Sequence, residues 1–285
     1  MSAARQLRVL VDGLAYVESP RWHDGRLWFS HWGRDEVLAL DLDGNYEVVA
    51  PGRPGLGWAC AWLPDGRMLL TGETLLRREP EGRFVEHADL HGVLDAGCDD
   101  IVVDGRGNVY LNSIEFDFAG GSDQTGGKIA LLTPDGALRK VAEHLVFPNG
   151  MAVTPDNRTL IVAESFAGRL TAFDIADDGE LENRRVWAEV GDGAPDGICL
   201  DADDALWYAD VPNQRAVRVG EGGDVLDTIE LDRGCFACML GGPDRRTLFL
   251  LAAEWAGPEN VEAQLAAGTG RVYATDVEVA GTGWP

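Results

Sequence analysis

One short sequence motif recurs six times along the chain, and it constrains the fold more than any other feature. Each copy has an apolar run, a turn built on Asp-Gly, Asp-Asn or a similar pair, and a second run of aliphatic and aromatic residues. Asp, Asn and Gly tolerate the positive φ angles of tight turns, so each copy is predicted to be a β-hairpin. The copies are spaced by about 40 to 50 residues and begin at Ser19, Ala59, Asp100, Gly150, Gly197 and Cys238.

A further strand pair follows most of these hairpins, as in the segments VLALDLDGNYEVV and IALLTPDGALRKV. Four strands per repeat at this period are typical of a propeller blade. We therefore predict an all-β fold, a six-bladed β-propeller with four-stranded antiparallel blades, forming a single domain over residues 1–285. A β-sandwich would not give six nearly equal repeats. VYATDVEV is predicted to be the third strand of the last blade and LRVLVDG its outer strand, which would close the ring without a long free edge.

The net charge of −24 argues against binding to nucleic acid or to anionic membranes. No apolar run approaches the roughly 18 residues of a membrane span. The first residues lack the apolar core of a signal peptide, and the five cysteines are an odd number. These features predict a cytoplasmic protein with reduced thiols. Cys235 and Cys238 have CxxC spacing but no second pair for zinc, so they are predicted to be buried small residues without a metal or redox role.

Aligning the six hairpins on their turns places polar side chains in register. Five residues before the turn position, four of the six copies carry an oxygen-bearing side chain: Glu18, Asp99, Asn149 and Asp196. The other two copies carry Trp58 and Ala237. The innermost strand of each blade lines the central channel, so these four side chains are expected to converge at one mouth of it. Asp and Asn before a strand also bond to nearby backbone, but four such residues in register favour a shared site.

Three carboxylates held close together require a cation or strongly raised pKa values. All four proposed ligands are hard oxygens, which favours one Ca²⁺ ion and leaves Mg²⁺, Mn²⁺ and Zn²⁺ as alternatives.

The residues around these positions resemble those of a known family. The stretches Glu18-Ser-Pro-Arg-Trp22, Pro148-Asn149-Gly150-Met151 and Pro195-Asp196-Gly197 are similar to hallmarks of the senescence-marker/gluconolactonase (regucalcin-like) family, and the resemblance covers nearly the whole chain. It implies a six-bladed propeller with one catalytic divalent metal, often Ca²⁺, and lactone hydrolysis. It also implies that Glu18, Asn149 and Asp196 bind the metal, with Asp196 as general base or proton donor.

The third blade departs from the sugar-lactonase pattern. Sugar-lactone members typically have an Arg and an Asn-Asp-Gly here, whereas this chain reads Cys98-Asp99-Asp100. This looks more like the drug-responsive lactonase branch, in which an Asp joins the metal shell. We therefore expect a small-molecule lactone or ester substrate that is not necessarily a sugar lactone.

The expected mechanism is hydrolysis without a covalent nucleophile. The metal would polarise the lactone carbonyl, and Asp196 or Asp99 would take a proton from the attacking water. Two other functions stay open: a strictosidine-synthase-like enzyme and a protein-interaction scaffold. The oligomeric state stays open as well.

Three further residues are candidate substrate contacts. Glu115 follows the third hairpin and is expected at the channel mouth, with a solvated loop carboxylate as the alternative. Trp58 occupies the channel position of the second blade and could form an apolar wall over the ligand. His31 either points into the channel or is a satisfied core histidine. The Gly-rich segment 117–127 is a candidate for a second Ca²⁺ site through Asp117 and Asp123.

Overall fold

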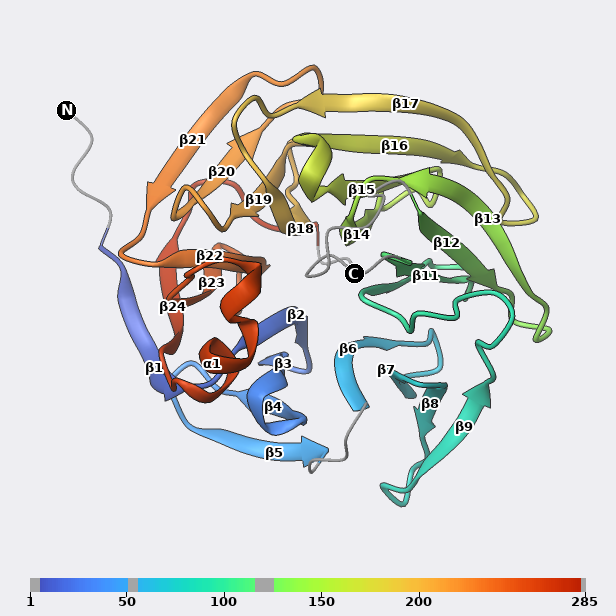
Figure 1. Ribbon diagram of the computed structural model, residues 1–285, viewed down its shortest axis with the longest axis horizontal. Coiled ribbons are helices and arrows are strands. Elements are labelled where there is room, and N and C mark those ends of the chain that lie inside the picture. Colours follow the sequence, from blue (N-terminus) through green and yellow to red (C-terminus); the bar gives the residue numbers. More distant parts are fainter. Residues whose placement is uncertain (1–5, 51–55, 116–125, 283–285) are drawn as a thin grey trace.

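The computed structural model describes residues 6–50, 56–115 and 126–282, and within these it leaves the side chains of residues 56–58, 258 and 262 undescribed. Six four-stranded antiparallel sheets follow one another around a central axis, which confirms the predicted six-bladed β-propeller (Figure 1). In each blade the first strand is innermost and neighbouring strands pair in sequence order, except where the ring closes. That residues 1–285 form a single domain stays a prediction, because the ring accounts only for the described residues.

The first three blades run consecutively along the chain. Blade 1 contains β2 (Val17–His23), β3 (Arg26–His31), β4 (Glu36–Leu40) and β5 (Tyr46–Ala50). Blade 2 contains β6 (Leu56–Trp62), β7 (Met68–Gly72), β8 (Leu75–Arg78) and β9 (Phe84–Ala88). Blade 3 contains β10 (Ile101–Val103), β11 (Val109–Ser113), β12 (Gly127–Leu132) and β13 (Leu138–Leu145).

The remaining blades complete the ring. Blade 4 contains β14 (Pro148–Val153), β15 (Thr159–Glu164), β16 (Arg169–Ile175) and β17 (Leu181–Glu189). Blade 5 contains β18 (Pro195–Leu200), β19 (Leu206–Asp210), β20 (Arg215–Val219) and β21 (Val225–Glu230). Blade 6 contains β22 (Gly234–Gly241), β23 (Thr247–Ala253), β24 (Gly270–Asp276) and β1 (Arg8–Leu14).

Blade 6 is built from both ends of the chain. Its outer strand is β1, which pairs antiparallel with β24, as the sequence predicts. The helical segments are short: η1 (Trp32–Arg34), η2 (Ser165–Ala167), η3 (Pro258–Asn260) and α1 (Val261–Ala266). Among the described residues no helix is long and apolar enough to cross a membrane.

The repeated sequence motif explains the hairpin turns and the apolar core. The hairpin turns contain residues with positive φ, such as Gly107 at 87° and Asn157 at 59°, where Gly and Asn are favoured. Apolar side chains pack between neighbouring blades; for example, Trp22 of blade 1 stacks on Phe249 of blade 6 with ring centroids 5.3 Å apart. The rigid ring holds the start of each innermost strand close to the axis.

Candidate metal centre

The four predicted ligands lie at one end of the innermost strands, in four different blades. Glu18 lies in β2, Asn149 in β14 and Asp196 in β18, and Asp99 lies two residues before β10. The ladder is irregular at these places: its register shifts between Glu18 and Arg21, between Pro148 and Met151, and between Pro195 and Ile198. Such shifts bend a strand and re-aim its side chains. Asn149 and Asp196 lie within the shifts and have no partner in the ladder, whereas Glu18 is paired with Ser30.

Two glycines allow the innermost strands to approach closely. A Cβ atom on Gly150 would lie 2.7 Å from the Asp196 carbonyl oxygen, and one on Gly197 would lie 2.6 Å from the Ala237 Cβ. The Asn-Gly and Asp-Gly pairs at these positions therefore combine a predicted oxygen ligand with a residue that needs no room for a side chain. That Asn149 and Asp196 are metal ligands stays a prediction, and the packing role of the two glycines was not predicted from the sequence.

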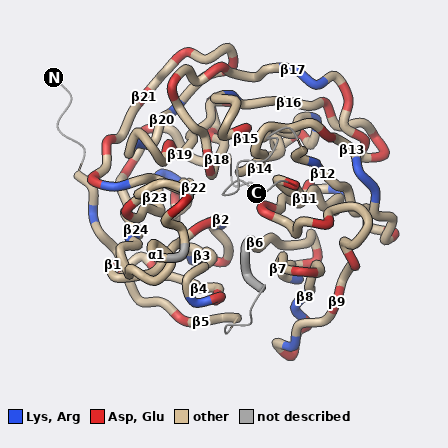
Figure 2. Tube along the Cα trace, in the orientation of Figure 1, with Lys and Arg blue, Asp and Glu red and all other residues tan. Residues whose placement is uncertain are grey.

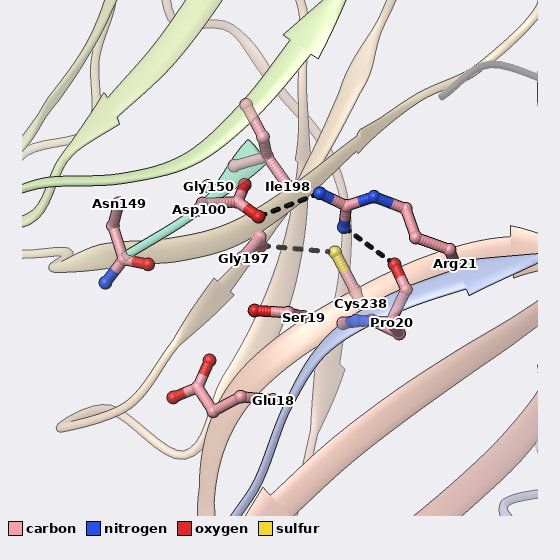
Figure 3. Close-up of a pocket in the computed structure, with 10 residues that line it drawn as sticks. All are labelled: Glu18, Ser19, Pro20, Arg21, Asp100, Asn149, Gly150, Gly197, Ile198 and Cys238. Atoms are coloured by element: carbon pink, nitrogen blue, oxygen red, sulfur yellow. Dashed lines mark hydrogen bonds and ion pairs between the residues drawn. The ribbon is translucent and has the colours of Figure 1, made fainter. Parts of the chain in front are cut away.

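A pocket lies at the axis beside these residues (Figure 3). Its lining comes from blade 1 (Glu18, Ser19, Pro20, Arg21), blade 3 (Asp100), blade 4 (Asn149, Gly150), blade 5 (Gly197, Ile198) and blade 6 (Cys238). Figure 3 shows Arg21 reaching toward Asp100, while the side chains of Glu18 and Asn149 extend on the other side of the pocket.

The carboxyl groups of the site make one another's ionisation less favourable. Burial, followed by the nearby Asp196, Asp99 and Asp100, raises the pKa of Glu18 well above its usual range. Burial and then Asp99 and Asp100 raise the pKa of Asp196 in the same way, although a hydrogen bond with Asn149 opposes this. Removal from water and the adjacent Asp100 raise the pKa of Asp99 to about 7. A cation at this position would relieve the repulsion.

The donor set fits a hard divalent cation. Three carboxylates and one amide oxygen are the ligand types that Ca²⁺ prefers. The buried Oδ1 atom of Asp196 has no hydrogen-bond partner, so this oxygen is available to bind a cation. In the described part of the chain, however, no three His, Cys, Asp or Glu side chains already stand close enough to hold a metal. Holding a metal here would therefore require the side chains to move closer together.

A buried ion pair between Arg21 and Asp100 is a feature that the sequence analysis missed. The Nη2 atom of Arg21 lies 2.8 Å from Asp100 Oδ1 and donates a 2.6 Å hydrogen bond to the Ile101 carbonyl. Both side chains are only 6% exposed. Arg21 belongs to blade 1 and Asp100 adjoins blade 3, so the pair joins two blades that are not neighbours, and the Arg21 charge offsets that of Asp100. The only sequence signal was that Asp100 adjoins Asp99.

Ser165 links blades 4 and 5 at the site. Its hydroxyl donates a 2.7 Å hydrogen bond to the Pro195 carbonyl, which precedes Asp196. The Asn149 side chain lies within 3.4 Å of the same hydroxyl. Two proposed ligands in neighbouring blades are thus connected through one serine.

The candidate substrate contacts have different surroundings. Glu115 Oε2 lies 3.2 Å from Lys128 Nζ, and its buried Oε1 has no hydrogen-bond partner, so Glu115 stays a candidate substrate contact. His31 accepts a 2.9 Å hydrogen bond from the Ala15 N–H at Nε2, and its Nδ1 lies 3.1 Å from Glu36. Both ring nitrogens of His31 are engaged, which favours the core role that the sequence left open.

Some predictions lie outside the described residues. The side chain of Trp58 is one, although its backbone belongs to β6, and Asp117 and Asp123 are the others.

The cysteines are all buried and none forms a disulfide among the described residues. Burial raises the pKa of both Cys235 and Cys238 well above the usual thiol range. Such thiols are poor nucleophiles, in keeping with the predicted packing role.

A family model described as the SMP-30/Gluconolactonase/LRE-like region matches residues 16–254. The chain belongs to this family. Diisopropyl-fluorophosphatase of Loligo vulgaris is 29% identical over 196 residues, which are 61% of this chain and 62% of the relative. The 6-deoxy-6-sulfogluconolactonase of Pseudomonas putida is 29% identical over 170 residues, or 57% of each chain. The matches therefore span less than two thirds of either relative.

Solved structures share the fold of this SMP-30/gluconolactonase family member. A calcium-binding protein, regucalcin, from Agrobacterium tumefaciens superposes with a TM-score of 0.82 at 22% identity, covering 99% of this chain and 97% of that one. The resemblance predicted from the three hallmark stretches is confirmed at the level of the family. The similarity to the drug-responsive branch stays a prediction.

Proposed function

We propose that this protein is a divalent-metal-dependent lactonase that opens the ring of a small-molecule lactone by hydrolysis. One observation carries the proposal: the hard-oxygen residues Glu18, Asp99, Asn149 and Asp196 occupy equivalent positions in four blades, with a buried and unpartnered Oδ1 on Asp196. Membership of a family that includes enzymes named as lactonases supports the same reaction class.

The residues of the site have different proposed roles in hydrolysis. Glu18, Asp99, Asn149 and Asp196 would hold the cation, which when bound supplies Lewis-acid polarisation of the carbonyl. Asp196 is the first candidate to accept the proton of the attacking water, because its Oδ1 is free of other hydrogen bonds. Asp99 is the second candidate, because its pKa near 7 suits proton transfer at neutral pH. Glu115 would contact polar groups of the substrate through its unpartnered Oε1.

The proposal commits to Ca²⁺ as the preferred ion. Oxygen-only ligands of mixed charge suit Ca²⁺ better than Zn²⁺, which favours nitrogen and sulfur. The name of the calcium-binding structural neighbour supports this choice.

The test is a hydrolysis assay of protein stripped with EDTA and then reloaded with CaCl₂, MgCl₂, MnCl₂ or ZnCl₂. The substrate panel contains aldonolactones, aromatic lactones, a simple aryl ester and diisopropyl fluorophosphate, the last because of the named fluorophosphatase relative. We expect lactone hydrolysis that EDTA abolishes and Ca²⁺ restores. Full activity in EDTA would reject the metal dependence, and no hydrolysis of any panel member with any metal would favour a non-hydrolytic propeller.

A further inference from the structure

Asn112 is a buried polar residue to which the proposed chemistry assigns no role. It lies in β11 of blade 3, and its side chain is fully buried. Its Oδ1 accepts a 2.8 Å hydrogen bond from the Asp100 N–H, and its Nδ2 donates a 2.6 Å hydrogen bond to the Asn149 carbonyl oxygen. One amide group therefore bonds to the backbone of blade 4 and to the segment that leads into β10.

The main chain of Asn112 adds two more bonds to the same segment. Its carbonyl accepts a 2.9 Å hydrogen bond from the Asp99 N–H, and its N–H donates a 3.1 Å hydrogen bond to the Asp100 carbonyl. Asn112 thus contacts the backbone of two proposed ligands, Asp99 and Asn149, that belong to different blades.

Regular strand pairing does not hold these two ligands. Strand β10 begins at Ile101, after Asp99, and the β14 ladder is interrupted between Pro148 and Met151, where Asn149 lies. Among the described residues, a second hydrogen bond joins these segments, 2.9 Å long from the Met151 N–H to Asp100 Oδ2, and apolar side chains of β10, β11 and β14 pack in one buried cluster. Of these two hydrogen bonds, the one from the Asn112 amide is the shorter, and it ends on the backbone of Asn149 itself.

We propose that Asn112 is a positioning residue that sets the spacing of Asp99 and Asn149 for metal binding. The inference rests on the proposed function, because it takes these residues as metal ligands. A group that orients ligands without touching the metal typically contributes about 10- to 100-fold to metal affinity. A merely structural asparagine would contribute to folding stability and leave the metal affinity of the folded protein unchanged.

The same hairpin offers a matched control in Asn108. It is also buried, but it lies at the turn end of the hairpin, where its Nδ2 donates a 2.9 Å hydrogen bond to Asp104 Oδ2. Asn108→Ala removes the same amide group from the same blade, so it controls for the general loss of a buried hydrogen bond.

The experiment compares Asn112→Ala, Asn108→Ala and the wild-type protein. Stability is measured by urea unfolding in EDTA. The affinity for Ca²⁺ is measured by isothermal titration calorimetry of the metal-stripped protein, without urea and at a temperature at which the protein is fully folded. We expect both variants to lose stability, but only Asn112→Ala to lose about 10- to 100-fold in Ca²⁺ affinity.

A second variant keeps the test decisive if Asn112→Ala does not fold. Asn112→Asp keeps the size of the side chain and the acceptor for the Asp100 N–H, but it loses the donor to Asn149. Its added negative charge would by itself favour a cation, so a loss of Ca²⁺ affinity reports a change in ligand spacing.

Two negative outcomes are distinguishable. Equal Ca²⁺ affinities for the wild type and the folded Asn112 variants would overturn the positioning role and leave the proposed function standing. A wild-type protein that binds no divalent metal would overturn the proposed metal site and this inference together.

Discussion

Asp196 is the residue on which the proposed chemistry depends most directly. Its side chain is 7% exposed, and its Oδ1 has no hydrogen-bond partner. An unpaired buried acceptor is costly unless a ligand or a proton satisfies it, so the position suits a site that binds either.

Replacing Asp196 by Asn should separate metal binding from proton transfer. The amide keeps an oxygen ligand but cannot accept a proton, so we expect turnover to fall by about 10²- to 10⁴-fold while some metal is retained. The measurement pairs steady-state lactonase kinetics with metal content. Asp192→Asn is the control and should behave as wild type, because this side chain in the turn before β18 is 83% exposed. Near-full turnover of Asp196→Asn with metal bound would make Asp196 a ligand only and Asp99 the leading base.

The metal-free protein should lose stability as the pH rises through neutrality. The folded-state pKa values of Glu18, Asp99 and Asp196 are raised, so the folded chain binds these protons more tightly than the unfolded chain. For Asp99 the stabilising contribution is complete below about pH 4 and is lost as the pH passes about 7, and the raised pKa values of Glu18 and Asp196 act in the same direction. Surface carboxylates with lowered pKa, such as Asp65, are already ionised in this upper range and do not alter the trend.

Urea midpoints in EDTA between about pH 5.5 and 8 test this sign. We expect the midpoint to fall with pH, to fall less in Asp99→Asn, and to rise with pH when Ca²⁺ is present, because the cation binds the ionised carboxylates. Burial lowers the pKa of His23, His31 and His87, and these groups therefore stabilise the folded chain increasingly as the pH rises. The decisive comparison is with Asp99→Asn: an equal pH dependence of the wild type and this variant would contradict the raised pKa of Asp99.

At the scale of the single strand, the innermost strands must approach one another without side-chain collision. Gly197 of β18 illustrates this, because a Cβ atom there would lie 2.6 Å from the Ala237 Cβ and 2.7 Å from its Cα. We expect Gly197→Ala to cost about 1–3 kcal/mol of folding stability through overpacking. The measurement is urea unfolding. Gly220→Ala in the same blade is the control, since its nearest neighbour would be 3.8 Å away. Equal stability of the two variants would show that β18 and β22 can separate at little cost.

The elements also show how far the sequence could predict the structure. The repeated hairpin motif predicted the blades because a tight turn and two apolar strands are local features of the sequence. The four proposed ligands could be aligned from the sequence because equivalent positions in a propeller face the same axis, and their role as ligands stays a prediction. Arg21, Asp100 and Asn112 were not predicted, because their contacts join different blades and depend on how the closed ring brings those blades together. The roles of Gly150 and Gly197 were missed for the same reason, since their neighbours are distant in sequence.

At the scale of the whole molecule, the ring concentrates negative charge at its centre within an already acidic protein. Acidic residues occur around the entire ring (Figure 2), and the net charge is −24. At the axis, Glu18, Asp99, Asp100 and Asp196 come together, and Arg21 is paired with Asp100 among them. The ring therefore brings four carboxyl groups near enough to raise one another's pKa values, and the Arg21 guanidinium neutralises part of their charge.

Replacing Arg21 should lower the folding stability of the ring and increase the stabilisation that Ca²⁺ provides. Arg21→Met keeps much of the side-chain volume but leaves the buried Asp100 carboxylate without its partner. Removing one member of a buried ion pair typically costs about 3–5 kcal/mol, so we expect a loss of this size in urea unfolding with EDTA. The loss of the positive charge also makes the axis more negative, so Ca²⁺ should raise the melting temperature of Arg21→Met by more than it raises that of the wild type.

Arg26→Met is the matched control for this prediction. Arg26 belongs to the same blade and pairs with Glu47, but their side chains are 43% and 61% exposed. A solvent-exposed pair contributes little to stability, so Arg26→Met should match the wild type in both measurements. If Arg21→Met unfolded at the wild-type urea concentration, the axial ion pair would not stabilise the ring. If its response to Ca²⁺ matched that of the wild type, the charge of Arg21 would not be felt at the metal site, and the four proposed ligands alone would set the affinity for the cation.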